Sequence, residues 1–555
     1  MKTRTAALQS IRDKSFDLCV IGGGATGLGS ALDAQLRGLS TVLVDAGDFV
    51  SQTSSASTKL VHGGVRYLQQ ALVEVDYQQF QMVRKALKER IHLLGAAPYL
   101  ARPLTLLVPC YSRLQMFYIA AGMKIYDLIA GDARLSPSRI LSRADAEATI
   151  PSLRMDKVVG AVTYADGQFD DARYGLALAK TSAQLGCELI NYVRIVGFDH
   201  TPDGKLAAAY AEDTISGDRF KIAARTFLNC TGPFADGIRL LANPLATPRL
   251  RMSKGIHILL PLDTLRSDTA LLIPKTDDGR VIFAIPWFGS LLVGTTEDEI
   301  EQATDLVATD HEIAYLLKYI NRYLNTAFTS SDIQAAFAGV RPLVASTGKV
   351  NTKKLVRDHE VEVDGASGLI SVLGGKWTTY RAMAEDGIDH VERKLGRAKS
   401  ASSTRSQPLT GAPGYTASHW QHLVSQYGLS EHVAKHMAQK FGTDALQVVE
   451  TIRSEPGLSE PVFPGSDVLA GEVLYCIREE MPQSIEDMLA RRVGIQVHNW
   501  NHAIAAAPVV GSLLGRELGW SPEATDQAIH AYIAKVQAWA SKAAIPLNAA
   551  HTHSS

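Results

Sequence analysis

A strand–turn–helix–strand unit near the N-terminus is the feature that most limits the fold of this 555-residue chain. Residues 16–21 form a short apolar run that ends at the glycines of residues 22–24. Residues 28–36 then carry apolar side chains at helical spacing, Gly38 ends the helix, and residues 41–44 begin a second strand. A helix that joins two strands in this way predicts a doubly wound α/β fold.

The glycines of this unit have the spacing G-x-G-x-x-G at Gly22, Gly24 and Gly27. The first permits a tight turn, the second lets the backbone approach a pyrophosphate, and the third lets the helix pack against the strand. The phosphates then meet free N–H groups at the positive end of the helix dipole. Asp45 ends the second strand, where a carboxylate accepts hydrogen bonds from the ribose hydroxyls of adenosine. The unit predicts a dinucleotide site but does not separate NAD from FAD.

Length and composition indicate a globular protein of two or three domains. The chain is about twice as long as a single core usually allows, and 46% of its residues are apolar and 20% charged. A net charge of -1 argues against nucleic acid as the main partner. The five scattered cysteines form no CxxC, and the first 15 residues have no apolar signal core, which favours a reducing, cytoplasmic compartment. No apolar run reaches the roughly 18 residues that a membrane span needs.

Sequence patterns divide the chain into a long α/β part and a helical part. Mixed β-branched and helical stretches at about residues 160–400 suggest a large inserted sheet, so residues 1–397 are expected to form one domain. Residues 398–414 have a linker composition, 415–543 are expected to be all-α, and 544–555 form a tail. The expected helical segments of the all-α domain are 417–427, 431–453, 467–490 and 522–543.

Several longer motifs stand in a characteristic order. They are SSASTKLVHGGVRYL at residues 54–68, GVRPL at 339–343, Arg357-Asp358, and GGKWTTYR at 374–381. Together they resemble the FAD-dependent glycerol-3-phosphate dehydrogenases of the D-amino-acid-oxidase-like flavoprotein superfamily. The similarity covers about residues 15–395, and the helical C-terminus also resembles that family. Asp45 stands where the family often has Glu, and Trp377 occupies a variable position.

The resemblance implies FAD as the cofactor, held in a doubly wound FAD-binding domain with an inserted antiparallel β-sheet substrate domain. It also implies oxidation of sn-glycerol 3-phosphate to dihydroxyacetone phosphate by hydride transfer from C2 to flavin N5. The expected cofactor contacts are Gly22, Gly24, Thr26, Gly27, Asp45, Ser54, Ser55, Ser57, Lys59, His62, Gly63, Gly64, Thr231, Gly232, Gly374, Gly375, Lys376 and Thr378.

Substrate candidates follow from the charge of the phosphate, which favours fork-shaped arginine donors. The expected substrate-binding residues are Arg66, Tyr67, Arg357 and Lys376. His257 is the expected catalytic base, because a neutral imidazole is the usual proton acceptor near pH 7. Arg341 is the second catalytic candidate and either binds the phosphate or holds the developing alkoxide.

The electron acceptor is expected to be external, since the sequence has no iron–sulfur spacing, haem motif or second dinucleotide motif. Residues 114–129 are apolar but too short to span a bilayer, and form either a helix in the membrane surface or a buried amphipathic helix. The resemblance favours a peripheral enzyme on the inner face of the cytoplasmic membrane that reduces a quinone. An oxidase that uses oxygen and a non-catalytic FAD-binding scaffold are the alternatives, and a homodimer stays among the expected partners.

Two further patterns in the sequence are interpreted as structural rather than functional. His432 and His436 have the i,i+4 spacing of helical zinc ligands, but no third ligand is nearby, so no metal is expected. Arg491-Arg492 follows an acidic helix and is interpreted as a cap on the negative end of the helix dipole.

Overall fold

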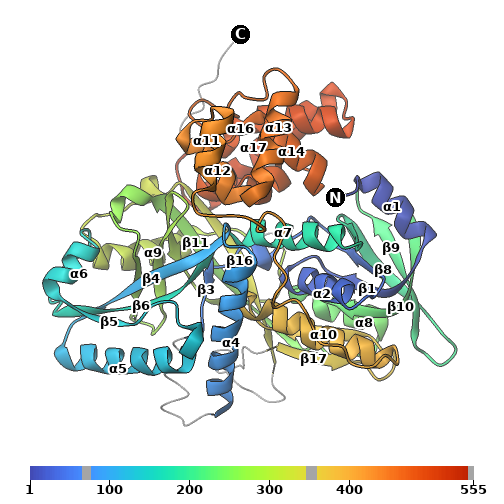
Figure 1. Cartoon of the computed structure of the whole chain (residues 1–555), viewed down its shortest axis with the longest axis horizontal. Helices are drawn as coiled ribbons and strands as arrows, with labels where there is room; N and C mark the ends of the chain where they lie inside the picture. Colours follow the sequence, from blue (N-terminus) through green and yellow to red (C-terminus); the bar gives the residue numbers. More distant parts are fainter. Residues whose placement is uncertain (65–76, 275, 305, 346–358, 548–555) are drawn as a thin grey trace.

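The computed structural model describes residues 1–64, 77–274, 276–304, 306–345 and 359–547 (Figure 1). These residues form two β-sheets, with a group of C-terminal helices packed above both of them. The strands of the first sheet are β1 (Ser15–Ile21), β2 (Thr41–Val44), β7 (Glu188–Ile190), β8 (Val193–His200), β9 (Leu206–Asp213), β10 (Arg219–Asn229), β17 (His359–Val363) and β18 (Ile370–Gly374).

The first sheet confirms the doubly wound fold predicted from the glycine unit. Its main path runs β17-β18-β10-β1-β2-β7, and the pairing is parallel from β18 to β7. β1 lies between β10 and β2, with Ile21 paired to both Asn229 and Val44. The carboxyl ends of these three strands therefore meet at one edge of the sheet. Ligands of open α/β sheets bind at such an edge.

The second sheet has the strands β3 (Leu60–Val61), β4 (Ala101–Cys110), β5 (Arg139–Ser142), β6 (Gly160–Phe169), β11 (Leu250–Pro261), β12 (Ala270–Ile273), β13 (Ile282–Trp287), β14 (Ser290–Gly294), β15 (Asp298–Ile300) and β16 (Ala335–Val344). Its pairing is antiparallel except between β4 and β12. The sheet begins well before residue 160, so its predicted start was wrong. Pro103 and Pro109 within β4 disguise the strand, because proline is uncommon inside a sheet.

The helices of the α/β part are α1 (Arg4–Asp13), α2 (Ala25–Leu36), α4 (Tyr77–Ala96), α5 (Arg113–Ala130), α6 (Arg143–Thr149), α7 (Asp171–Gln184), α8 (Ala235–Ala242), α9 (Asp310–Tyr323) and α10 (Tyr380–Lys394). Short 3₁₀ helices are η1 (Thr53–Ser55), η2 (Gly131–Ala133), η3 (Gly232–Phe234), η4 (Leu262–Thr264), η5 (Ser330–Asp332), η7 (Trp377–Thr379) and η8 (Gly442–Asp444). α2 starts at the glycine turn and packs against both α7 and α10.

The C-terminal helices are α11 (His419–Tyr427), α12 (Glu431–Phe441), α13 (Ala445–Ser454), α14 (Ala470–Glu480), the π-helix η9 (Asp487–Arg492), α15 (Ile495–His498), α16 (Trp500–Leu518) and α17 (Pro522–Lys542). The helix expected over 467–490 is interrupted after Glu480, because Pro482 disfavours helical backbone at Met481, whose φ is 52°. α16 was not predicted, and Pro508 in its interior obscures it. The linker segment 398–414 contains neither helix nor strand.

The helical part packs directly on the second sheet. Its buried side chains belong to the same hydrophobic cluster as those of β11 and β14. The Trp500 N–H donates to Gln334 O at 2.9 Å, and the His498 ring stacks on Trp287 with the ring centroids 4.7 Å apart. All five cysteine side chains lie within the described residues, where they are buried and free of disulfides.

Residues 114–129, for which a membrane-surface helix and a buried amphipathic helix were the two hypotheses, form most of helix α5, which has one buried and one exposed face. Ala120, Met123 and Tyr126 are buried against the second sheet. On the other face Leu114 is 82% and Leu128 79% exposed, so the helix also presents apolar side chains to solvent. Among the described helices, none is long and apolar enough to cross a bilayer.

Candidate active site

The glycine turn has the close-packed backbone expected of a pyrophosphate site. Gly22 has a φ of 105°, and a Cβ there would lie 2.7 Å from Cys230 O. A Cβ at Gly27 would lie 1.8 Å from Gly22 O, so α2 can approach the turn this closely only because residue 27 has no side chain. Gly24 caps α2 without a side-chain bond, and the next amide, Ala25 N–H, donates to Ser54 Oγ at 3.0 Å. The turn therefore presents backbone rather than side chains at the place where a pyrophosphate is expected.

Asp45 lies against this turn at the end of β2. Its carboxylate accepts from Gly23 N at 2.5 Å and from Gly47 N at 2.8 Å, and burial raises its pKa to about 6. Across the same edge of the sheet, Thr231 Oγ1 donates to Asn229 Oδ1 at 2.7 Å, and Gly232 follows with a φ of 54°. Thr26 sits in the first turn of α2. The structure thus brings the residues expected around the adenosine and pyrophosphate together at one edge.

The serine-rich loop after η1 is tied to the interior by charge. Lys59 is 1% exposed; its ammonium pairs with Asp171 and donates to Ser55 O at 2.7 Å. Ser57 Oγ also donates to Asp171, at 2.7 Å. The Lys59 ammonium is therefore not on the cavity wall, where a cofactor contact was expected, and instead anchors the loop from inside.

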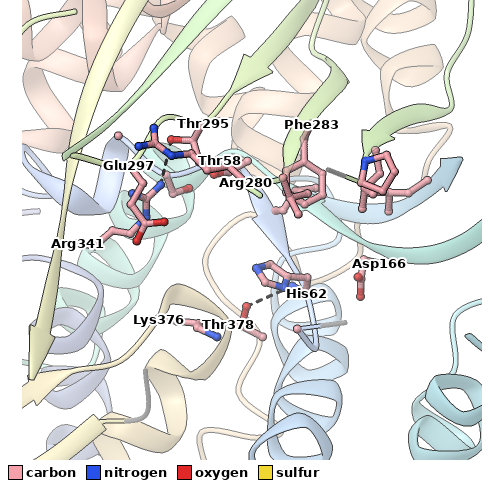
Figure 2. Close-up of a pocket in the computed structure, with 18 of the residues that line it drawn as sticks. Thr58, His62, Asp166, Arg280, Phe283, Thr295, Glu297, Arg341, Lys376 and Thr378 are labelled. Atoms are coloured by element: carbon pink, nitrogen blue, oxygen red, sulfur yellow. Dashed lines mark hydrogen bonds between the residues drawn. The ribbon is translucent and has the colours of Figure 1, made fainter. Parts of the chain in front are cut away.

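A cavity of about 1040 Å³ adjoins this loop. Its walls come from residues 53–64, the Gly374–Thr378 segment, strands of the second sheet, and α5. Among the predicted residues, Ser57, His62, Gly64, His257, Arg341, Gly374, Gly375, Lys376 and Thr378 line it. Two bonds hold the segments together: His62 N–H donates to Thr378 Oγ1 at 3.3 Å (Figure 2), and Trp377 Nε1 donates to Ser54 O at 2.8 Å.

His257 is a buried, neutral imidazole in this wall. It lies on β11, is 2% exposed and stacks on Phe337 of β16, with 4.9 Å between ring centroids. Its Nε2 is 3.0 Å from Thr58 Oγ1, while Nδ1 has no hydrogen-bond partner within the described residues. Burial, together with the charges of Arg341 and Lys59, lowers its pKa well below 6.5. A neutral imidazole is able to accept a proton at physiological pH.

Arg341 reaches the same region from β16 because the strand opposite it has a glycine. Its Nη2 donates to Thr295 Oγ1 at 3.0 Å (Figure 2). A Cβ on Gly255 would lie 2.7 Å from that Nη2, so the guanidinium occupies the space above Gly255. A Cβ on Gly339, paired with Gly255, would lie 2.4 Å from Ala56 O. The two glycines let the arginine and the serine-rich loop close on the second sheet.

Sequence reasoning missed several residues of the cavity wall. Arg280 lines it and pairs with Asp278 at 2.9 Å, but nothing around it in the sequence marks it. Asp166 also lines it and accepts from Arg90 at 2.6 Å and from Tyr126 Oη at 2.9 Å. Tyr126 Oη in turn accepts from Gly63 N at 2.9 Å. These residues belong to separate elements, so only the fold reveals the network.

Three predicted substrate residues, Arg66, Tyr67 and Arg357, lie outside the described residues. Within the described part, the site combines a glycine turn at the edge of the parallel sheet with a cavity lined by a neutral imidazole, His257, and by Arg341. A parallel sheet with a glycine turn at this edge, beside a second and mostly antiparallel sheet, is the architecture of a dinucleotide-dependent oxidoreductase. Residues 17–381 match the FAD dependent oxidoreductase family, and residues 402–525 match the C-terminal domain of alpha-glycerophosphate oxidase.

Comparison with individual relatives shows which flavin-dependent oxidoreductases this chain is similar to. The chain is 40% identical over 530 residues to the probable mitochondrial glycerol-3-phosphate dehydrogenase of Caenorhabditis elegans, covering 94% of this chain and 73% of that protein. It is 38% identical over 534 residues to the human mitochondrial glycerol-3-phosphate dehydrogenase, with 93% and 73% covered. The structure of the Bacillus halodurans glycerol-3-phosphate dehydrogenase with FAD matches with a TM-score of 0.81 at 26% identity, covering 98% and 99%. The chain belongs to the FAD-dependent glycerol-3-phosphate dehydrogenase family and uses FAD.

Proposed function

We propose that this chain oxidises sn-glycerol 3-phosphate to dihydroxyacetone phosphate and passes the electrons to a membrane quinone. The observation that carries the reaction is the neutral His257 beside the cationic Arg341 in the wall of one cavity. Bound FAD supplies the hydride acceptor, N5, for the hydrogen on C2. The chain itself supplies the base, the anion site and the closed surroundings.

His257 takes the proton of the C2 hydroxyl. We assign this role to Nε2 acting through Thr58, whose Oγ1 lies 3.0 Å from it and lines the cavity: the Thr58 hydroxyl passes its proton to Nε2 and takes the proton of the substrate hydroxyl. The stacking of the ring on Phe337 fixes its plane. A base held neutral by burial is ready to accept a proton without first losing one.

Arg341 stabilises negative charge on the substrate. Its guanidinium is held over Gly255 by Thr295, and a charge-assisted hydrogen bond to an alkoxide or phosphate oxygen is stronger than a neutral one. Lys376 and Arg280 add positive charge to the same cavity. Arg66, Tyr67 and Arg357 remain proposed phosphate ligands on the strength of their motifs.

The route to a quinone is supported by α5. Leu114, Phe117 and Leu128 are 82%, 60% and 79% exposed on its outer face. Residues of the same helix, among them Tyr118 and Ile119, line the cavity. An amphipathic helix with exposed large apolar side chains suits the interface of a lipid bilayer. An apolar acceptor arriving from the bilayer would therefore meet the cavity through this helix.

Substrate identity is tested by mixing the yellow protein with glycerol 3-phosphate, glycerol or lactate without oxygen. The expected result is rapid bleaching by glycerol 3-phosphate and not by the two compounds that lack its phosphate or its glycerol skeleton. Absence of bleaching by any of them would favour a non-catalytic FAD scaffold. Reoxidation of the bleached protein by a soluble quinone is expected to be faster than by oxygen, and the reverse order would make the protein an oxidase.

The membrane contact is tested by a triple variant, Leu114→Ser, Phe117→Ser and Leu128→Ser. Because these side chains are exposed, dye-linked activity and FAD content should be retained. Each side chain buried in lipid contributes about 1.5–3 kcal/mol, so liposome binding and quinone-linked activity should fall together. The matched control is Leu245→Ser, an apolar residue that is 89% exposed far from α5 in sequence. Unchanged liposome binding in the triple variant would contradict the membrane proposal.

A further inference from the structure

The loop that follows β2 is bonded through its last residue, Asp48, to the helical part of the chain. We call residues 45–48 the ribose loop, because Asp45 is the proposed partner of the adenosine ribose. Asp48 is 1% exposed and accepts from Arg491 Nε at 2.7 Å and from Arg492 Nη2 at 2.8 Å. Arg492 Nη1 and Asn191 Nδ2 also donate to this carboxylate, the latter at 3.0 Å. The ribose loop thus ends in a buried contact with residues more than 440 positions away.

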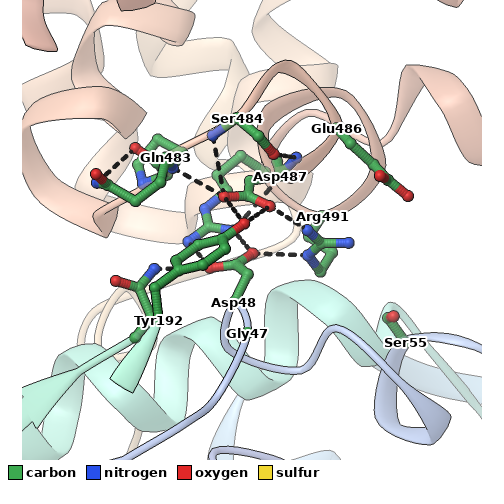
Figure 3. Close-up of polar contacts among 12 residues, drawn as sticks. Gly47, Asp48, Ser55, Tyr192, Gln483, Ser484, Glu486, Asp487 and Arg491 are labelled. Atoms are coloured by element: carbon green, nitrogen blue, oxygen red, sulfur yellow. Dashed lines mark hydrogen bonds and ion pairs between the residues drawn. The ribbon is translucent and has the colours of Figure 1, made fainter. Parts of the chain in front are cut away.

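The arginines come from the π-helix η9 and are themselves held in place (Figure 3). Arg491 Nη2 donates to Asp487 Oδ1 at 2.5 Å, and Arg492 Nη2 donates to Glu480 O at 2.6 Å. Burial alone would raise the pKa of Asp48, but the charges of Arg492 and Arg491 outweigh it and lower that pKa. The predicted cap on the acidic helix is present for Arg492, whose bond to Glu480 O meets the last carbonyl of α14, but the sequence did not indicate that both arginines are buried and bonded to Asp48.

Asp48 is connected to Asp45 through a short piece of backbone in which Gly47 is hydrogen-bonded on both sides. Gly47 N donates to the Asp45 carboxylate at 2.8 Å, and Gly47 O accepts from Tyr192 N at 2.9 Å. Tyr192 also belongs to the cluster, since its hydroxyl donates to Asp487 at 2.9 Å. A displacement of Asp48 would therefore move Gly47, and with it one of the two amides that orient the Asp45 carboxylate.

We propose that Asp48, gripped by Arg491 and Arg492, is a positioning residue that aims Asp45 at the adenosine ribose of FAD. Docking of the helical part then sets the affinity for the cofactor. The inference rests on the proposed role of Asp45 and not on the substrate or the electron acceptor. If the Asp48–Arg491–Arg492 cluster only joined two parts of the chain, its loss would lower the stability of the fold but would not specifically weaken FAD binding.

The test compares Asp48→Asn with a matched interdomain variant, Glu480→Gln. Glu480 forms a buried ion pair with Arg173 at 2.6 and 2.9 Å, which joins the same two parts without contacting the ribose loop. Both variants should lower the melting temperature of the FAD-free protein. FAD release from diluted holoenzyme, followed by flavin fluorescence, should show at least a tenfold weaker Kd for Asp48→Asn and a change below twofold for Glu480→Gln.

Two further variants test the positioning role even where Asp48→Asn does not fold. Tyr192→Phe removes one bond of the cluster while keeping the ring, so it should fold even where Asp48→Asn does not, and should weaken FAD binding by a few fold. In an Asp45→Asn background, Asp48→Asn should have little additional effect on the Kd. Unchanged FAD binding in Asp45→Asn would show that the ribose assignment is at fault. Equal loss of FAD in Asp48→Asn and Glu480→Gln, or none in Tyr192→Phe, would overturn the positioning role.

Discussion

Gly255→Ala should slow catalysis because the new methyl group would displace the guanidinium of Arg341. The new Cβ would lie 2.5 Å from Thr295 Oγ1 and 2.7 and 2.8 Å from the two terminal nitrogens of Arg341. These contacts are shorter than real Cβ contacts, and the atoms that must yield are the flexible end of the arginine. We therefore expect the fold to survive and the guanidinium to shift.

The size of the effect follows from the bond that the shifted arginine no longer makes. A hydrogen bond to a charged group contributes about 1.5–3 kcal/mol, which corresponds to a loss of roughly tenfold to a hundredfold in kcat/KM for glycerol 3-phosphate. The assay is dye-linked oxidation of glycerol 3-phosphate, with FAD content measured on the same sample. FAD should stay bound, since Gly255 lies on β11 and not in the glycine turn.

Gly237→Ala is the matched control, because no atom would lie within 4 Å of its Cβ. Activity of this variant should equal that of the parent protein. In an Arg341→Ala background, Gly255→Ala should cost less than twofold, since coupled residues are non-additive. A full kcat/KM in Gly255→Ala with normal FAD content would refute the argument that this glycine positions the arginine.

Four other predictions follow from the same geometry. Arg341→Ala should keep FAD but raise KM strongly and lower kcat/KM roughly tenfold to a hundredfold, whereas unchanged kinetics would remove Arg341 from the site. Gly24→Val should give colourless protein, because a side chain would face Ser54 Oγ, 2.9 Å from a Cβ, and block the pyrophosphate; full flavin loading would contradict this placement. Since the pKa of His257 lies well below 6.5, the rate of flavin reduction at saturating substrate should stay level from about pH 8 down through 6.5 in stopped-flow measurements. Burial lowers the pKa of His498 to about 3, so below pH 6.5 the unfolded chain binds a proton at this residue that the folded chain does not. The free energy of unfolding should therefore fall by up to about 1.4 kcal/mol per pH unit as the pH drops below 6.5, and it should fall less steeply in His498→Gln.

The elements predicted best are those whose pattern is local. The turn at Gly22–Gly27 fixes a strand, a helix and the edge where they meet, and the structure places them as expected. The second sheet was harder to place because its strands come from two distant stretches of chain and β4 contains prolines. α16 was missed for a related reason, since Pro508 and its small residues hide the periodicity of a helix that tertiary packing stabilises.

Site residues were predictable where a motif marks them and not where only the fold brings them together. Arg341 lies in the GVRPL motif, and the structure places it in the cavity wall together with His257. Arg280 and Asp166 have no such marker, because their roles depend on strands that meet in space. Lys59 lies within a motif, yet its ammonium faces Asp171 rather than the cavity. A motif therefore identifies a loop more securely than it assigns the side chains within it.

Helix α5 connects the loop beside the expected flavin to the face of the molecule that we propose contacts the membrane. Tyr126, on its buried face, accepts from Gly63 N and so fixes the loop beside the expected flavin position. Leu128, only two residues later, is 79% exposed on the opposite face. Since an α-helix rises about 1.5 Å per residue and bends little over such a distance, a contact made by the outer face cannot shift without moving Tyr126. Docking of α5 on a bilayer, as proposed above, would therefore fix the loop at Gly63 relative to the membrane surface.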